Sequence, residues 1–452
     1  MNTAAFDDVL LIPSRRLDAN LSSLPAVNRS IDVPLIASNA SNLKRLMAFA
    51  GPGFLVAVRY MDPGNWATAL AGGSQFGYSL LTVIVASNLM ATLLQAAAVR
   101  LGLASGLDLA QACRRHLPPR LSFLLWGGCE VAIVACNLAE VLGMAIGLNL
   151  LFKLPLPLGV CVTAADVMLV LGLQRRGFRC LEALVIGLIA LIGACFAAQL
   201  CWLHPAAGEV ARGLIPSTQL VSNSQMLYLA VGIMGATVMP HNLYLHSSVV
   251  QTRRYEKSEA GRRHAIRFAT IDSNIALVLA LLVNAGILVV AAGVFHRPDQ
   301  QPVTELSDAY RLLSPLLGVG IASAVFGIGL IASGLSSSVT GTLAGQIVME
   351  GFLDIKMSAP ARALLTRCLA IVPAVIVTAC YGVSGAGALL VFSQVVLSLQ
   401  LPFAVVPLLW FTTRRRHLGT LAFGRATAVI MWATAFVVVT VNIWMLQRLL
   451  VV

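Results

Sequence analysis

The sequence predicts an all-α integral membrane protein with about eleven transmembrane helices. Hydrophobic residues make up 58% of the 452 residues and charged residues only 11%, whereas a soluble globular protein carries about 25% charged residues. The apolar residues are gathered in blocks of about 20, long enough to cross a hydrocarbon core about 30 Å thick. A soluble protein with a few buried helices does not need so many uninterrupted apolar blocks, so the sequence argues against a soluble fold.

The apolar blocks follow one another closely along the chain. We expect spans at residues 48–71, 79–100, 121–150, 157–173, 181–202, 225–250, 267–295, 316–349, 363–381, 387–411 and 424–447. The short connections leave no room for a soluble module, so one membrane domain is predicted over residues 46–450. Residues 1–45 contain no apolar core of a signal peptide and are predicted to form an N-terminal cytosolic tail.

Lys and Arg are distributed unevenly between the two sides of the predicted membrane domain. If the N-terminus is cytosolic, 25 of the 31 Lys and Arg residues fall in inside segments, 5 fall in outside segments and Arg59 falls within a span. This bias places the N-terminus inside and, with eleven spans, the C-terminus outside. It also explains the net charge of +12 as a consequence of topology, so nucleic acid is not an expected partner.

The nine cysteines are scattered, mostly within apolar spans, and form no CxxC pair. This pattern is typical neither of a zinc site nor of a disulfide framework. No resident cofactor and no obligate protein partner are expected, and membrane lipid is the expected surrounding of the chain.

The first span is interrupted near its middle by the sequence Asp62-Pro63-Gly64-Asn65. Pro removes a backbone donor and Gly lowers helix propensity further, so the helix is expected to break here. Broken backbone is tolerated at membrane depth only where protein or a hydrated cavity covers it. An Asp at this depth costs about 2.5–3.5 kcal/mol on insertion scales, which favours a cation ligand that can also accept a proton. The alternative is a structural pairing of Asp62 with Arg59, one turn earlier.

The sixth span carries a matching interruption at Met239-Pro240-His241. Five spans separate the two breaks, and an odd offset turns the second unit upside down relative to the first. Interrupted helices at corresponding positions of two halves are a pointer to the binding site of an inverted-repeat transporter. We therefore expect inverted repeats at about residues 48–202 and 225–411, followed by a final helix at about 424–447.

The side chains at the two breaks indicate which ion they bind. Asp62 and Asn65 offer hard oxygen ligands, whereas Met239 offers a thioether sulfur directly before the helix-breaking proline. Oxygen ligands alone suit Mg²⁺ or Ca²⁺, but sulfur favours a softer ion such as Mn²⁺, Fe²⁺, Co²⁺ or Cd²⁺. The ligand chemistry therefore favours a transition metal.

The two motifs resemble the signatures of the Nramp family of proton-coupled divalent-metal transporters. The resemblance extends to Trp66-Ala67-Thr68 after the first break, to residues 337–346 in the eighth span and to residues 393–402 in the tenth. It covers about residues 45–450. It implies a LeuT-like fold with broken first and sixth helices, and metal transport rather than catalysis.

The resemblance also implies a ligand set. Metal is expected to be bound by the side chains of Asp62, Asn65 and Met239 and by the backbone carbonyl of Ala236, and Gln394 would join them in the occluded state. Asn284 in the seventh span matches a family position that supports the site.

Proton movement requires titratable groups that lead away from the metal, and Asp62 is the expected first acceptor. Family resemblance favours His241 as a participant, while His246 is either a participant or a packing residue. In the third span Glu130, Asn137 and Glu140 lie on one helical face, and Glu140 matches a family acid. Arg367 is expected either at the cytosolic end of the route or as a charge that only fixes topology.

Two positions depart from the family pattern. Asn137 stands where the family usually has Asp, which removes one titratable group from the expected route. Arg59 stands where the family has a small residue, and a guanidinium facing a dication would be repulsive. Either the Arg59 side chain points away, toward Glu140 or another acid, or affinity or coupling is altered.

The sequence therefore predicts import of Mn²⁺, and also of Fe²⁺, Co²⁺ and Cd²⁺, together with protons by alternating access across a bacterial plasma (inner) membrane. One alternative is metal uniport or channel-like transport with weak proton coupling. Another is a cation-coupled carrier of small solutes on the same fold, which needs no thioether ligand.

Overall fold

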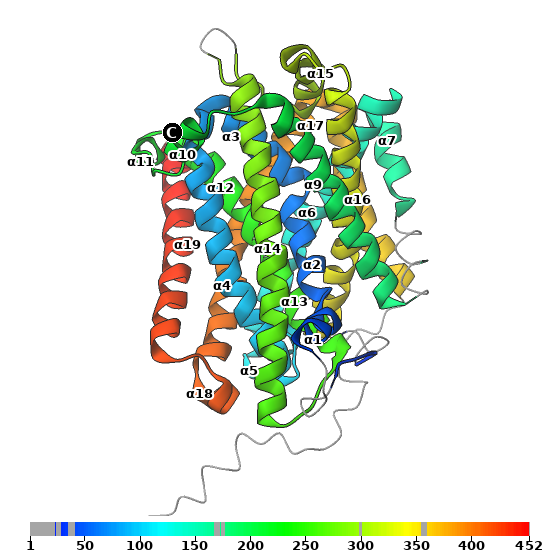
Figure 1. The fold of residues 1–452 in the computed structure, drawn as a ribbon. Coiled ribbons are helices and arrows are strands. Elements are labelled where there is room, and N and C mark those ends of the chain that lie inside the picture. Colours follow the sequence, from blue (N-terminus) through cyan, green and yellow to red (C-terminus); the bar gives the residue numbers. More distant parts are fainter. Residues whose placement is uncertain are drawn as a thin grey trace, which may run out of the picture.

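The fold is a bundle of long helices that run roughly side by side (Figure 1). The computed structural model describes residue 23 and residues 29–34, 41–166, 172, 177–297, 301–353 and 359–451. Its first half contains β1 (Ile31–Asp32), α1 (Asn42–Phe49), α2 (Pro52–Ala57), η3 (Val58–Met61), α3 (Pro63–Phe76), η4 (Gly77–Leu80), α4 (Leu81–Ser105), α5 (Leu109–His116), α6 (Pro119–Phe152), α7 (Leu156–Thr163) and α9 (Phe178–Leu203). The second half contains α10 (Ala207–Arg212), α11 (Gln219–Ser222), α12 (Ser224–Val238), α13 (Pro240–Val249), η5 (Val250–Thr252), β2 (Arg253–Arg254), α14 (Glu259–Phe295), α15 (Leu306–Leu317), α16 (Ala322–Leu353), α17 (Ala359–Thr413), α18 (Arg415–Leu418), η6 (Gly419–Leu421) and α19 (Arg425–Val451).

Nine helical runs within the described residues are long and apolar enough to cross a membrane. This number is smaller than the eleven spans expected from the sequence, and the difference arises at two places in the chain. The run Pro63–Ser105 joins the second half of the first expected span to the second span, and the fourth expected span falls partly on residues outside the described part of the chain. The all-α, multi-pass architecture predicted from composition is confirmed.

Both predicted helix breaks are present. Asp62 has extended backbone (φ −67°, ψ 164°) and separates η3 from α3, while Met239 has non-helical backbone (φ 13°, ψ 112°) and separates α12 from α13. Each second half-helix begins with a proline, Pro63 or Pro240, which suits the first turn because that position needs no backbone donor. The two breaks are thus built from the same local chemistry in two halves of the chain.

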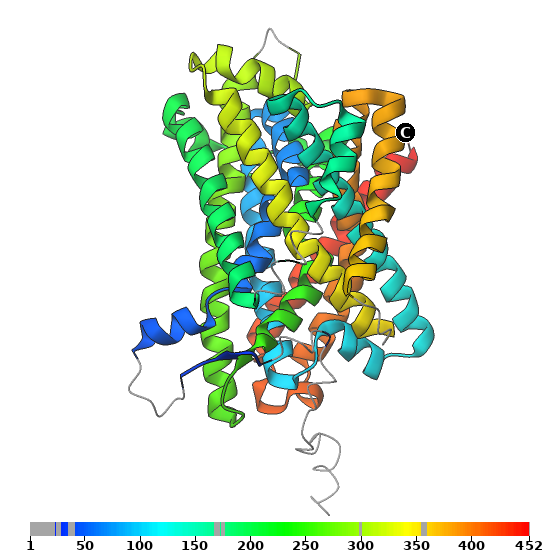
Figure 2. The same cartoon turned by 90° about the vertical axis from the view of Figure 1, so that its right-hand side faces the viewer.

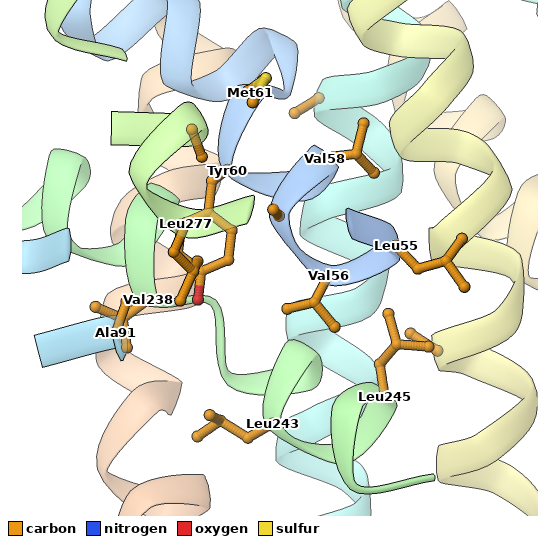
Figure 3. Close-up of a cluster of buried hydrophobic side chains, with 14 of the residues drawn as sticks. Leu55, Val56, Val58, Tyr60, Met61, Ala91, Val238, Leu243, Leu245 and Leu277 are labelled. Atoms are coloured by element: carbon orange, nitrogen blue, oxygen red, sulfur yellow. The ribbon is translucent and has the colours of Figure 1, made fainter. Parts of the chain in front are cut away.

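Large apolar side chains surround the two breaks. Tyr60, Met61 and Val238 are fully buried, and they pack among residues of α2, α4, α13 and α14 (Figure 3). The Trp66 indole lies edge-on between the rings of Phe196 and Phe326 and donates a hydrogen bond to the Met61 carbonyl oxygen at 3.0 Å. This bond satisfies one of the carbonyls that the interrupted helix frees.

The short elements gather at the two ends of the bundle. Helices α1, α5 and α18 lie at one end, and α10, α11, α15 and the C-terminus lie at the other (Figure 1). At the end with α1, β1 pairs in parallel with β2, which follows the second broken helix (Figure 2). The segment before the first span therefore contacts the segment after α13.

Candidate metal-binding site

Three oxygen atoms converge on the side-chain amide of Asn65. The Asn65 Nδ2 atom lies 2.9 Å from Asp62 Oδ1, 2.9 Å from the Ala236 carbonyl oxygen and 3.5 Å from the Arg59 carbonyl oxygen. The carboxylate comes from the first break, and the Ala236 carbonyl comes from the last turn of α12, where the second break removes its helical partner. Since an amide oxygen and nitrogen exchange places by a half-turn of the side chain, Asn65 can present an oxygen to the same point.

Asp62 also caps the half-helix that begins beside it. Its Oδ1 atom accepts a hydrogen bond from the Asn65 backbone N–H at 2.8 Å, as an N-cap residue does. This bond fixes one carboxylate oxygen at the positive end of α3. The second oxygen, Oδ2, lies 3.7 Å from the Cys136 sulfur.

Met239 is fully buried and packs against Ala132, Cys136 and Leu397. Cys136 of this cluster also contacts Asp62, which connects Met239 to the carboxylate through one residue of α6. Within the described residues, no three His, Cys, Asp or Glu side chains cluster as a metal site. A metal held here would therefore use one carboxylate together with amide, carbonyl and sulfur ligands.

Gln394 reaches the first break from α17. A Cβ atom placed on Gly64 would lie 1.9 Å from Gln394 Nε2, and one placed on Gly235 would lie 2.1 Å from the Gln394 carbonyl oxygen. The two glycines, one beside each break, thus let α17 pack directly against both broken helices. The Gln394 Oε1 atom is buried and has no hydrogen-bond partner among the described residues, which leaves it available as a ligand.

The Arg59 side chain is directed to Glu140 of α6. Its Nη2 atom lies 3.1 Å from Glu140 Oε1 and 2.8 Å from the Cys136 sulfur, and its Nη1 atom donates to the Ser337 carbonyl oxygen at 3.1 Å. This orientation is the first of the two alternatives that the sequence left open. The Arg59 carbonyl oxygen, in contrast, faces Asn65.

A buried network of charges extends from the site between α6, α16 and α17. The Glu140 Oε2 atom lies 3.4 Å from Arg367 Nη1, and Arg367 Nη2 forms an ion pair with Asp166. Ser337 donates to Glu140 at 2.9 Å and Ser338 donates to Asp166 at 2.6 Å. Arg367 is thus buried and paired with two acids. A charge that only fixes topology would need neither the burial nor the two partners.

The remaining predicted residues are also buried, with different partners. His246 Nδ1 lies 2.9 Å from Gln95 Oε1, and Gln95 Nε2 donates to the Tyr60 hydroxyl at 2.9 Å. Neither ring nitrogen of His241 has a hydrogen-bond partner in the described part of the chain, and the same holds for Asn284 Oδ1. His241 lies on α13 and Asn284 on α14, and neither belongs to the charge network.

Asn137 lies on α6 one turn before Glu140. A Cβ atom placed on Gly341 would lie 2.7 Å from Asn137 Oδ1 and 2.8 Å from Arg59 Nη1. The two departures from the family pattern therefore meet at Gly341 of α16. Glu130, two turns before Asn137 on the same helix, accepts a hydrogen bond from the Trp126 indole at 3.1 Å.

Sequence reasoning missed two residues of this site, Cys136 and Asp166. Cys136 contacts Asp62, Arg59 and Glu140, but a cysteine in an apolar span is usually a small packing residue. Asp166 is an acid within the fourth expected span, and an intramembrane acid is a functional candidate by default. That signal was available in the sequence.

The end of the bundle near α1 is closed by polar contacts around the start of α2. Arg253 pairs with Glu182 at 2.7 Å and donates to the Ala50 carbonyl oxygen at 2.5 Å, and Arg179 donates to the same carbonyl at 2.7 Å. The Asp272 carboxylate accepts from the Gly53 N–H at 2.7 Å. These bonds hold the first half-helix in place, and Asp62 and Met239 have no exposed surface.

Comparison with known proteins identifies relatives over nearly the whole chain. The chain is 58% identical to the divalent metal cation transporter MntH of Bradyrhizobium diazoefficiens over 94% of each protein, and 52% identical to that of Listeria monocytogenes over 96% of each. Among solved structures, the manganese transporter of Eremococcus coleocola matches with a TM-score of 0.86 at 40% identity, covering 93% of this chain and 90% of that one.

A more distant structure supports the fold alone. Mhp1, a nucleobase-cation-symport-1 family transporter, matches with a TM-score of 0.60 at 15% identity, over 88% of this chain and 91% of that one. These relatives are named as transporters, and the chain is accordingly a multi-pass membrane transporter rather than an enzyme. The sequence pattern of the family described as natural resistance-associated macrophage protein-like matches residues 53–448, so the chain belongs to the Nramp family.

Proposed function

We propose that this protein imports divalent transition-metal ions, Mn²⁺ foremost, into the cytosol together with protons. The observation that carries the proposal is the convergence of Asp62, Asn65 and the Ala236 carbonyl at the paired helix breaks, with Met239 nearby. The proposal agrees with the names of the relatives, which include divalent metal cation transporters and a manganese transporter.

The choice of a transition metal rests on the mixed ligand set. Oxygen ligands bind Mg²⁺, Ca²⁺ and Mn²⁺ alike, whereas a thioether adds affinity only for the softer ions. Met239 would supply that sulfur, and Gln394 would complete the shell. The same reasoning extends the substrates to Fe²⁺, Co²⁺ and Cd²⁺.

Alternating access would expose this site first to one side and then to the other. The contacts of Arg253 and Arg179 with the Ala50 carbonyl hold the end with α1 closed. Breaking them would free α2 to move relative to α3, because the Asp62 backbone between them is extended rather than helical. The half-helix would then open the metal site to that end.

The proton would be taken up at Asp62 and transferred along the network of Glu140, Arg367 and Asp166. Metal and proton compete for one carboxylate, so release of a proton from Asp62 accompanies binding of the metal. His241, which lies just beyond the second break, would take part in the same proton pathway.

Uniport with weak proton coupling is the second candidate, and Arg59 favours it. This fixed positive charge pairs with Glu140 at 3.1 Å and so occupies the acid that would receive the proton from the metal site. Asn137, in addition, cannot titrate. Both features reduce the number of groups that can carry a proton away from the metal.

The proposed location is the bacterial plasma (inner) membrane with the N-terminus in the cytosol and the C-terminus outside. The bacterial origin of the relatives supports the location in a bacterial membrane. The excess of Lys and Arg in the segments predicted to lie inside supports the orientation, with α1, α5 and α18 at the cytosolic end.

Simultaneous measurement of Mn²⁺ and proton entry in liposomes tests the proposal. Purified protein is reconstituted with a metal-sensitive dye and a pH-sensitive dye inside, and protein-free liposomes serve as the control. Entry of Mn²⁺ with acidification of the interior is the expected result. Entry of Mn²⁺ without any pH change would favour uniport, and absence of Mn²⁺ entry would refute metal transport.

A further inference from the structure

A second site with a defined chemistry lies at the end of the bundle with α1, α5 and α18. A cavity of about 450 Å³ opens between α4, α14 and η6. Its wall consists of Arg100 on α4, Leu421 in η6 and five residues of α14, namely Arg263, Ile266, Arg267, Thr270 and Ile271. Three guanidinium groups thus face one cavity whose other walls are mostly apolar.

The arginines of this cavity are incompletely neutralised. Arg263 pairs with Glu259 at 2.7 Å, and both side chains are about half exposed. Arg100 donates to the Leu421 carbonyl oxygen at 2.9 Å and lies over the Phe423 ring, with its Nε atom buried and unpartnered in the described part of the chain. Arg267 is exposed and has no ion pair or hydrogen bond with any described residue. One acid faces three arginines, so the cavity keeps a net positive charge.

The cavity lies at the edge of the membrane-facing surface. Along α14, Arg267 shares one face with Ile271, Ile275 and Leu282, because their spacing follows the helical period. Ile275 and Leu282 are exposed by 44% and 63%, as side chains in contact with lipid tails are. At 1.5 Å per residue, Arg267 lies about 12 Å along the helix from Ile275. The predicted span 267–295 begins at Arg267, so the guanidinium groups are expected at the level of the lipid headgroups.

We propose that this cavity binds the phosphate of an anionic phospholipid from the leaflet at this end of the bundle. Guanidinium groups bind phosphate oxygens through paired N–H donors, and basic pockets between membrane helices on the cytosolic side bind lipid headgroups. Ile266, Ile271 and Leu421 would contact the glycerol and the first methylene groups. A free phosphate shares the charge but not the apolar part, so the mixed wall favours a lipid.

A bound lipid would connect three separate parts of the bundle. Arg100, the two arginines of α14 and Leu421 of η6 are far apart in the sequence. One phosphate would join the three arginines, and the rest of the lipid would contact Leu421. The site is separate from the metal-binding residues and makes no use of them, so its occupancy is independent of the proposed transport.

Thermal unfolding of the purified full chain in neutral detergent tests the proposal. A ligand that binds only the native state raises Tm as its concentration rises. The probes are phosphatidylglycerol, phosphatidylcholine and inorganic phosphate, and the variants are Arg267→Gln and Arg263→Gln. Arg115→Gln on α5 is the matched control, because this arginine is exposed at the same end but does not line the cavity.

Phosphatidylglycerol is expected to stabilise the wild type and the control alike, whereas phosphatidylcholine is not. Each variant of the cavity should need about fivefold more phosphatidylglycerol for the same rise in Tm. If both variants respond like Arg115→Gln, the proposed site is wrong. Equal stabilisation by inorganic phosphate would also overturn it, since the ligand would then be a soluble anion. Arg263→Gln provides the comparison should Arg267→Gln fail to fold.

Discussion

Arg59 and Glu140 form an ion pair of 3.1 Å in which neither side chain has any exposed surface. The pair joins the first broken helix to α6 and gives the Arg59 charge an acidic partner other than Asp62. Glu140 also contacts Arg367 at 3.4 Å, so this carboxylate lies between two guanidinium groups.

The Arg59→Met variant should destabilise the protein. Removal of one partner from a buried ion pair costs about 3–5 kcal/mol because the other charge stays buried; since Glu140 retains Arg367, the lower end is expected. Chemical unfolding in detergent measures the loss. The double variant Arg59→Met/Glu140→Gln should recover part of it, and a double variant less stable than both single ones would contradict the pairing.

The Gly64→Ala variant should weaken metal binding. The added methyl group would lie 1.9 Å from Gln394 Nε2, so the Gln394 side chain must move away from the site. Loss of one ligand is expected to lower Mn²⁺ affinity by about tenfold, on the scale of a single charge-assisted contact. Gly127→Ala is the control, since no atom lies within 4 Å of its added Cβ. Equal affinities for both variants, measured by calorimetry, would argue against a role for Gln394.

The Arg253→Gln variant should open the end of the bundle near α1. The variant removes the pairing with Glu182 and the bond to the Ala50 carbonyl oxygen, which hold the start of α2. Alkylation of Cys136, buried beside Asp62, should therefore become faster, as mass spectrometry of that peptide would reveal.

Arg254→Gln serves as the control for that experiment. Arg254 pairs with Asp32 at the surface, where both side chains are largely exposed, and such pairs contribute little. If Cys136 reacts equally fast in both variants, Arg253 does not hold this end closed.

Stability should depend on pH through Glu305, which precedes α15 outside the membrane spans. Burial raises the pKa of the Glu305 carboxyl to about 7, and the nearby Asp308 has a smaller effect in the same direction. The hydrogen bond from the Gly387 backbone N–H acts in the opposite direction and lowers this pKa. Because the folded-state pKa is raised, the stabilising contribution is present at low pH and is lost as pH rises toward 7. Glu305→Gln should flatten the decline of Tm between about pH 4.5 and 7; a slope identical to that of the wild type would contradict this.

The sequence predicted the spans and the two breaks because each depends on local composition. A bilayer requires about 20 apolar residues per crossing. Pro63 and Pro240 each lack the backbone donor that would continue the preceding helix, and each begins a new half-helix. The direction of the Arg59 side chain could not be predicted in this way. It depends on Glu140, Cys136 and Ser337, which α6 and α16 bring to it only in the folded bundle.

Asp166 illustrates the same limit. It meets Arg367 and Ser338 across 201 and 172 positions of sequence, and no periodicity in the fourth span indicates that contact. For the same reason, the sequence alone does not decide between the two interpretations of Arg367. Long-range packing, and not local pattern, decides which intramembrane charges are connected.

The most direct test of the central claim is Mn²⁺ binding to the Asp62→Ala variant, measured by calorimetry beside the wild type and Asp308→Asn. Asp62 supplies the one carboxylate at the paired breaks, so its loss should abolish measurable Mn²⁺ binding, while Asp308→Asn, altered at the surface of α15, should bind as the wild type does. Wild-type affinity in a folded Asp62→Ala protein would contradict the assignment of the metal site.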